Sequence, residues 1–250
     1  MSKSYGQYCP LAIAAELLGE RWTLLVISRL IDGCRRFNDI HRGVPKISAT
    51  LLATRLTQLQ NAGLCEKRPL PDGSGHQYVP TPACMELDPI VMQLAAWGQR
   101  WGRDMEGEDL DPAFLAWSIG TRVDTRTMPP GRTVVEFEFS GLAREFRRFW
   151  MVADDGRVDM CLKNPGFEVD VVVRTEIRRF VETWRGFRDL EAEIASGAIR
   201  LEGSPKMQRA FPGWLLGSAL ASQPRCRPGL EHQLYERNRA RPGPAATRRP

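Results

Sequence analysis

A helix followed directly by a hairpin constrains the fold of this chain more than any other feature. The stretch from Gly43 to Pro82 reads GVPKISATLLATRLTQLQNAGLCEKRPLPDGSGHQYVPTP. Ser48 is a suitable N-cap. The leucines at 52, 56 and 59 recur at helical spacing, which predicts a helix over 48–62 with one buried side. The Asp-Gly and Gly content of residues 71–76 then predicts a turn between strands at 64–70 and 77–81.

Further helices flank this unit. Residues 10–31 predict two helices separated by Gly19, residues 36–42 a short one, and residues 82–103 a long helix after the hairpin. The three helices directly before the hairpin, the hairpin itself and the long helix after it follow the order of a winged helix-turn-helix domain.

The charge is unevenly distributed along the 250 residues, whose net charge is +5. Residues 1–104 carry 12 Lys/Arg against 9 Asp/Glu, whereas residues 105–224 carry 16 against 19. A basic first part fits a nucleic-acid partner for that part. The N-terminus lacks an apolar secretory segment, and no run has the length of a membrane-spanning helix. We therefore expect a cytoplasmic protein without membrane insertion.

Enzymatic and metal-binding motifs are absent from the sequence. The six cysteines form no CxxC, and the three histidines do not cluster with them, so we expect no metal site. The sequence has no G-x-S-x-G, phosphate loop or G-x-G-x-x-G, so we expect no catalytic residues and no cofactor.

The second half of the sequence has mostly strand-type patterns, followed by helical ones. The alternation in TVVEFEFS, residues 133–140, predicts a strand with Phe137 and Phe139 on one side. The patterns that follow predict strands at 148–153, 158–162, 168–173 and 198–202, and helices at 175–184, 190–195 and 205–211. This order implies an α+β domain. The predicted division is a first domain at 1–104, a linker at 105–114, a second domain at 115–222 and a disordered basic tail at 223–250.

Two surfaces of the first domain suit DNA. Thr50 and Thr54 lie on the arc of helix 48–62 that faces away from the leucines, with Gln58 at its edge, and uncharged hydrogen-bonding side chains can read base edges in a major groove. Lys67 and Arg68 on the hairpin suit phosphates. The alternatives are an ordinary solvated helix face and an ordinary surface hairpin.

Residues 9–102 resemble the HxlR family of bacterial winged helix-turn-helix transcriptional regulators. The resemblance lies in Cys9-Pro10, LLGERWTLLVISRLIDGCRRFNDI, ISATLLATRLTQLQNAGLCEKR, YVPTPACMEL and LAAWGQRW. It implies a homodimer, joined through the N-terminal helix and helix 82–103, on palindromic double-stranded DNA. Family members often have a basic residue at the position of Thr50, whereas Ser48 and Arg55 match the family pattern. The predicted DNA-binding residues are Arg36, Ser48, Thr50, Thr54, Arg55, Gln58, Lys67, Arg68, Ser74 and His76.

Cys9 is a candidate redox sensor. It directly precedes Pro10 at a predicted helix start, where the helix dipole favours a thiolate. The resembled family includes members that sense oxidants or electrophiles through a cysteine at this position. The alternative is a small capping residue.

Residues 115–220 resemble a sterol carrier protein-like fold. The matching stretch is FEVDVVVRTEIRRFVETWRGFRDLEAEIASGAIRLEGSPKMQRAFPGWL. The resemblance implies a mostly antiparallel sheet covered by helices, with an apolar tunnel for a small-molecule effector. Its candidate lining residues are Phe137, Phe139, Phe180, Trp184, Phe211 and Trp214, for which the alternative is an ordinary core.

The favoured interpretation is a transcription regulator controlled by an apolar ligand or by thiol modification. The alternative is a lipid-binding or carrier module whose winged helix mediates protein contacts.

Overall fold

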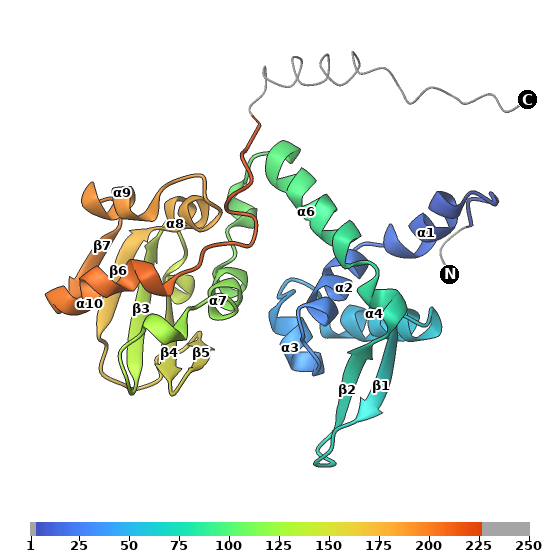
Figure 1. Cartoon of the computed structure of the whole chain (residues 1–250), viewed down its shortest axis with the longest axis horizontal. Coiled ribbons are helices and arrows are strands. Elements are labelled where there is room, and N and C mark those ends of the chain that lie inside the picture. Colours follow the sequence, from blue (N-terminus) through green and yellow to red (C-terminus); the bar gives the residue numbers. More distant parts are fainter. Residues whose placement is uncertain (1–3, 227–250) are drawn as a thin grey trace, which may run out of the picture.

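The structure, a computed structural model, describes residues 4–226 as two units, one on each side of a long helix, α6 (Figure 1). The elements of the first unit are α1 (Pro10–Leu18), α2 (Thr23–Ile31), α3 (Phe37–Arg42), α4 (Ala49–Asn61), β1 (Cys65–Pro69), β2 (His76–Pro80), α5 (Pro82–Met85) and α6 (Asp88–Trp101). The predicted order of helices and hairpin is confirmed.

The core of the first unit forms where α2 and α3 pack against α4. Leu52, Leu56 and Leu59 are fully buried, as their helical spacing predicts. They lie in one cluster with Val26, Ile27, Leu30, Ile40, Val44 and Ile47. Ser48 caps α4, because its hydroxyl accepts a hydrogen bond from the backbone N–H of Leu51 at 3.3 Å. The buried leucines fix the rotation of α4 and therefore which side of it faces outward.

The predicted single helix over 82–103 is two helices. The chain turns at Glu86 and Leu87, and Pro89 stands in the first turn of α6, where its missing N–H costs nothing. Three apolar side chains of α6 are not buried within the chain: Ile90, Leu94 and Trp97 are 50%, 49% and 61% exposed.

The second unit is a mixed five-stranded sheet with helices. Its elements are α7 (Pro112–Gly120), β3 (Thr133–Ser140), β4 (Arg148–Asp154), β5 (Arg157–Cys161), β6 (Val171–Glu176), α8 (Ile177–Trp184), α9 (Leu190–Ala195), β7 (Arg200–Gly203) and α10 (Pro205–Ala210). The strand order is β5-β4-β3-β6-β7. The central pair, β3 and β6, is parallel, and the other three pairs are antiparallel.

The strand predicted at 168–173 lies three residues further along the chain. β6 pairs with β3 from Val135↔Val171 to Ser140↔Glu176. This parallel ladder keeps residues 174–176 extended, so helix α8 begins at Ile177 instead of the predicted Thr175. Pairing between distant segments therefore overrides the local pattern here.

The two faces of the sheet differ, as the alternation in β3 predicts. Val135, Phe137 and Phe139 point into the main core with α7 and α8. On the other face, Val134 belongs to a small cluster with Trp150 and Val152. The same face carries an ion-pair ladder in which Arg148 contacts Glu138 at 3.0 Å and Arg174 contacts both Glu138 and Glu202.

Helix α7 was not predicted from the sequence. Asp111 caps it by accepting hydrogen bonds from the N–H groups of Ala113 and Phe114, and Pro112 occupies its first turn. Its residue Trp117 reaches the first unit, where the Arg29 guanidinium lies 4.1 Å from the ring centroid. The predicted linker at 105–114 thus contains the start of a helix that contacts both units.

The segment that follows the second unit returns to α6 at residues 225 and 226. The N–H of Cys226 donates to the carbonyl of Arg100 at 3.0 Å, and Arg225 donates to the carbonyl of Gly102 at 3.0 Å. Residues 223–226 of the predicted tail are thus ordered against α6, and residues 227–250 lie outside the described range. None of the helices within residues 4–226 combines the length and the apolar character that crossing a bilayer requires.

Candidate nucleic-acid interface

The outward side of α4 carries the side chains predicted to contact base edges. Thr50, Thr54 and Thr57 are exposed, and Gln58 is half-buried at the edge of this face. The hydroxyls of Thr54 and Thr57 donate to the carbonyls of Thr50 and Ala53, each at 3.0 Å. Their oxygen lone pairs and methyl groups remain available, so the face can accept hydrogen bonds and contact thymine methyl groups.

Arg55 lies on a different side of α4 and is held inside the unit. Its guanidinium pairs with Glu20 at 3.0 Å and donates to the carbonyl of Arg21 at 3.0 Å and to Gln58 at 2.6 Å. Only 11% of the side chain is exposed. These bonds fix α4 to the turn between α1 and α2, and a direct DNA contact of Arg55 stays a prediction. The partner, Glu20, carried no sequence signal of this contact.

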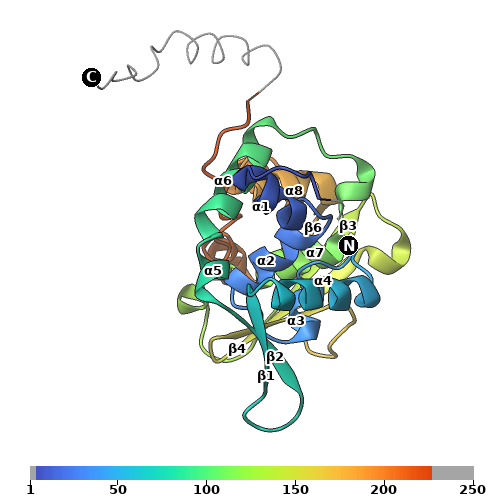
Figure 2. The ribbon, with the colours of Figure 1, turned by 90° about the vertical axis from the view of Figure 1, so that its right-hand side faces the viewer.

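The hairpin β1–β2 projects away from α4 as a wing (Figure 2). Lys67 pairs across the ladder with Tyr78, and the exposed His76 stands opposite Pro69. Lys67 and Arg68 are both exposed, but the Arg68 guanidinium lies 2.6 Å from Glu66. Of the two cations on this strand, Arg68 has an ion-pair partner and Lys67 has none within the described residues.

The tip of the wing is ordered by its own side chains. The Ser74 N–H and hydroxyl donate to one oxygen of Asp72, at 2.9 and 2.7 Å. These two bonds, with a smaller contribution from Arg36, lower the pKa of the Asp72 carboxyl. Arg36, at the start of α3, lies 3.9 Å from Asp72 and is 56% exposed. The wing tip and the entry to α3 are therefore neighbours.

Comparison with known proteins identifies this unit. Residues 17–106 match the HxlR-like helix-turn-helix family. The chain is 34% identical over 95 residues to the HTH-type transcriptional regulator YodB of Bacillus subtilis, across 37% of this chain and 85% of YodB. The chain belongs to the HxlR-like helix-turn-helix family. Its first hundred residues are thus an HxlR-type transcriptional regulator domain, a kind of domain that implies DNA binding.

A mycobacterial relative agrees with this assignment. An uncharacterized HTH-type transcriptional regulator of Mycobacterium tuberculosis, Rv3095, is 31% identical over 131 residues, across 47% of this chain and 81% of that protein. A solved structure of the reduced form of YodB from B. subtilis is 31% identical and covers 40% of this chain and all of that chain, with a TM-score of 0.35. These HxlR relatives are transcriptional regulators and not enzymes. The family match ends at residue 106, so the second unit lies outside it.

The candidate redox residue is accessible in this HxlR chain. Cys9 is exposed and is the N-cap of α1, and its side chain makes no capping hydrogen bond. Cys65 and Cys84 are buried, and burial raises the pKa of both thiols, that of Cys65 to about 11. A reagent in solution can therefore reach the Cys9 thiol, whereas the thiols of Cys65 and Cys84 are covered.

The six aromatic residues predicted to line a tunnel fill the core of the second unit. Each is at most 6% exposed. Phe137 lies 4.8 Å from Phe149 and 5.6 Å from Phe180, and Phe211 lies 5.8 Å from Trp214, between ring centroids. Such distances are those of directly packed rings. The geometry supports the alternative weighed for these residues, Phe137, Phe139, Phe180, Trp184, Phe211 and Trp214, which is an ordinary core.

The described residues include no group of three or more His, Cys, Asp or Glu side chains that could hold a metal ion. They do place a large cavity where α8 meets the segment after α6. Sequence reasoning missed this cavity because its arginines come from segments far apart in the chain.

Proposed function

We propose that this chain is a transcription regulator that binds palindromic operator DNA as a homodimer. The observation that carries the proposal is the exposed threonine face of α4 beside a wing that carries Lys67. Thr50, Thr54 and Gln58 would contact base edges, and Arg36, Lys67 and Arg68 would contact phosphates, with Ser74 and His76 at the wing tip. Ser48 and Arg55 would act by holding α4 in place.

Unpartnered apolar surface supports the homodimer. The α1 side chains Leu11 and Ile13 are 76% and 58% exposed, and no residue of α1 is buried. On α6, Ile90, Leu94 and Trp97 line an apolar groove. Contiguous exposed apolar surface marks protein contacts. Two chains joined through α1 and α6 would present two α4 helices to sites about one helical turn apart.

Thiol chemistry at Cys9 is a plausible input because of where α1 leads. The turn after α1 contains Glu20 and Arg21, and both contact Arg55 of α4. A modification that moves α1 would therefore shift the turn to which Arg55 fixes α4. The family contains redox-regulated members, among them YodB and HypR.

We also propose that the second unit has a sterol carrier-like fold, which its mixed sheet with helices supports. The alternative, a lipid carrier with a winged helix used for protein contacts, lacks a specific observation in its favour because the six aromatic side chains pack on one another.

The test is selection of operator fragments from a DNA library, followed by binding measurements at several salt concentrations. Thr54→Ala should reduce discrimination between sequences more than total affinity. Lys67→Ala should weaken binding to all sequences and reduce the salt slope by about one unit. The matched control is Lys163→Ala, an exposed lysine of the second unit. If the chain selects no fragment, or if Lys67→Ala behaves like Lys163→Ala, the proposal fails.

A further inference from the structure

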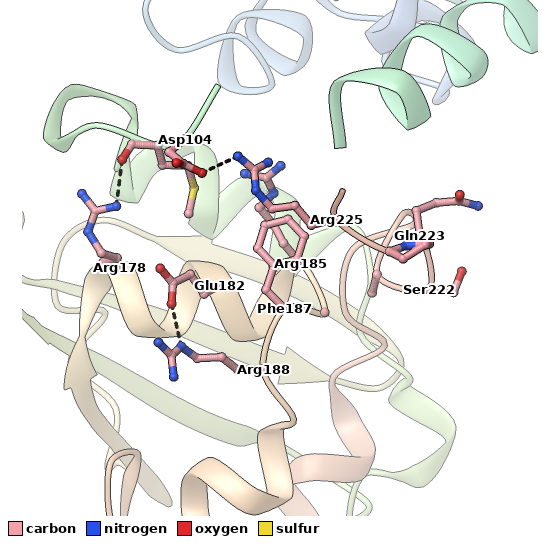
Figure 3. Close-up of a pocket in the computed structure, with 13 residues that line it drawn as sticks. Asp104, Arg178, Glu182, Arg185, Phe187, Arg188, Ser222, Gln223 and Arg225 are labelled. Carbon is pink, nitrogen blue, oxygen red and sulfur yellow. Dashed lines mark hydrogen bonds and ion pairs between the residues drawn. The ribbon is translucent and has the colours of Figure 1, made fainter. Parts of the chain in front are cut away.

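A large cavity lies where the second unit meets α6. Its volume is about 1040 Å³. The walls come from the segment after α6, from α8 and the loop that follows it, and from the returning chain at 221–225 (Figure 3). Pockets of roughly 300–1,000 Å³ hold small organic molecules. The cavity therefore has room for a whole metabolite and not just for an ion.

The cavity wall is cationic. It contains four arginines against two carboxylates, those of Asp104 and Glu182. Arg188 is engaged by Glu182 at 2.6 Å and by Glu193 at 3.2 Å, and Arg225 is paired with Asp104. Asp104 is 90% exposed, so water screens its effect on Arg225. The wall thus keeps an excess of positive charge.

Arg185 is the centre of that charge. Its guanidinium donates to the side-chain amide oxygen of Gln99, a neutral acceptor, and no carboxylate within the described residues forms an ion pair with it. Burial, and secondly the charge of Arg225, lower the pKa of Arg185. Two guanidinium groups that repel each other at a cavity wall are stabilised by an anion between them.

Phe187 holds the two cations in place. The Arg185 and Arg225 guanidinium carbons lie 4.7 and 5.6 Å from its ring centroid, within cation–π range. Figure 3 shows Arg185, Phe187 and Arg225 grouped in the middle, with Glu182 on one side of them and Ser222 on the other. Guanidinium groups bind phosphate and carboxylate groups in bidentate geometry, while Glu182, Ser222 and Gln223 can bind hydroxyl groups.

From this arrangement we propose that the cavity binds a hydroxylated phosphate ester of sugar-phosphate size. The phosphate lies between Arg185 and Arg225, the two arginines of the wall that share the Phe187 ring. The hydroxyl groups lie toward Glu182 and Ser222. This site goes beyond the proposed DNA binding, and it is tested without DNA.

The experiment is titration calorimetry of the full chain in phosphate-free buffer with glucose 6-phosphate, inorganic phosphate and glucose. Glucose 6-phosphate should bind more tightly than inorganic phosphate, and glucose should not bind. Arg185→Gln should weaken glucose 6-phosphate binding at least about tenfold, because a charge-assisted bond is lost. Arg157→Gln, at an exposed arginine of β5, should leave it unchanged.

A second pair of variants keeps the test sharp if Arg185→Gln disturbs folding. Ser222→Asp adds a negative charge to the wall without removing a bond made by an arginine, whereas Ser222→Asn is neutral and of similar size. Ser222→Asp should weaken binding at least about tenfold relative to Ser222→Asn. Equal affinities for these two variants, or no binding of glucose 6-phosphate to the unmodified chain at about 10 mM, would overturn the proposal.

Discussion

Gln99 of α6 and Arg185 at the end of α8 are joined by three hydrogen bonds, although 86 residues separate them in the sequence. The Gln99 side-chain oxygen accepts from Nε and Nη2 of Arg185, at 3.0 and 2.8 Å, and its amide nitrogen donates to the Arg185 carbonyl at 2.9 Å. Gln99 is 4% exposed, so its amide cannot bond to water in the folded chain. The three bonds to Arg185 take the place of those hydrogen bonds to water.

The first prediction follows from this pair. Gln99→Ala should lower the free energy of unfolding by about 1–3 kcal/mol, because it leaves the half-buried Arg185 without its acceptor. Denaturant unfolding of Gln99→Ala, Arg185→Ala and the double variant measures the coupling. The two effects should be less than additive. Full additivity would show that the two residues do not stabilise each other.

The second prediction concerns Arg55. Arg55→Ala removes its bonds to Glu20, Arg21 and Gln58. It should destabilise the first unit by about 1–3 kcal/mol, because Glu20 and the Arg21 carbonyl lose a partly buried donor. Arg42→Ala breaks an exposed ion pair with Asp39 and should cost at most about 1 kcal/mol. Thermal unfolding compares them, and equal losses would contradict the positioning role of Arg55.

The third prediction concerns the apolar surface of α6. Trp97→Glu places a charge in the groove lined by Ile90 and Leu94 and should convert a dimer to a monomer at micromolar concentration. Sedimentation velocity measures the change. Phe146→Glu, at a 57% exposed side chain of the second unit, serves as the control and should leave the oligomeric state unchanged. A wild-type chain that sediments as a monomer would refute the dimer itself.

The fourth prediction concerns how fast the thiols of Cys9 and Cys65 react with an electrophile. An electrophile at pH 7 should modify Cys9 at least about tenfold faster than Cys65, because thiolates are the reactive form, Cys9 is exposed, and the pKa of the buried Cys65 is raised to about 11. Peptide mass mapping of the labelled chain gives both rates. In denaturant the rates should converge. Fast labelling of Cys65 in the folded chain would contradict its burial.

The same shift affects stability at alkaline pH. Since the folded-state pKa of Cys65 lies above the ordinary 9.0, the folded chain holds this proton more tightly than the unfolded chain. The resulting contribution to stability is complete below pH 9 and is lost as the pH rises toward 11. Cys65→Ala should flatten the dependence of the unfolding free energy on pH in this window.

The fifth prediction links the cavity to DNA. Asp104 and Met105 of the cavity wall follow directly after α6, and Arg185 is bonded to Gln99 of that helix. Saturating glucose 6-phosphate should change operator affinity by about 5- to 150-fold, and operator should change glucose 6-phosphate affinity by the same factor. Fluorescence anisotropy and calorimetry measure the two factors. Unchanged operator affinity would leave the cavity a binding site without a regulatory effect.

Local pattern was sufficient to predict the first unit. The leucines of α4 share one face because helical spacing places them there, and the Asp-Gly turn makes the wing. The position of Arg55 could not be predicted, since a lone arginine on a helix reveals its partner only when the turn at Glu20 is placed in space. For the apolar side of α6 only the family resemblance suggested a second chain, because an apolar stripe does not by itself say whether its own chain or a second chain covers it.

In the second unit, strands with clean alternation were predicted well and elements set by distant partners were not. β3 matched at both ends. β6 was displaced because its ladder with β3 decides its bounds. The cavity arginines come from α8, from the loop after it and from the segment that follows the second unit. Arg185 and Arg225 are 40 residues apart and belong to no common sequence motif, so the sequence does not predict that they meet.

The return of residues 225 and 226 to α6 has a consequence for the evolution of this chain. The chain enters the second unit at Gly102 and leaves it at Arg225, and the Arg225 guanidinium lies 3.0 Å from the Gly102 carbonyl. A module whose two ends meet at one point can be exchanged for another with little change to the helix that carries it. The two ends of the second unit therefore allow a different domain to be inserted between Gly102 and Arg225 while α6 stays as it is.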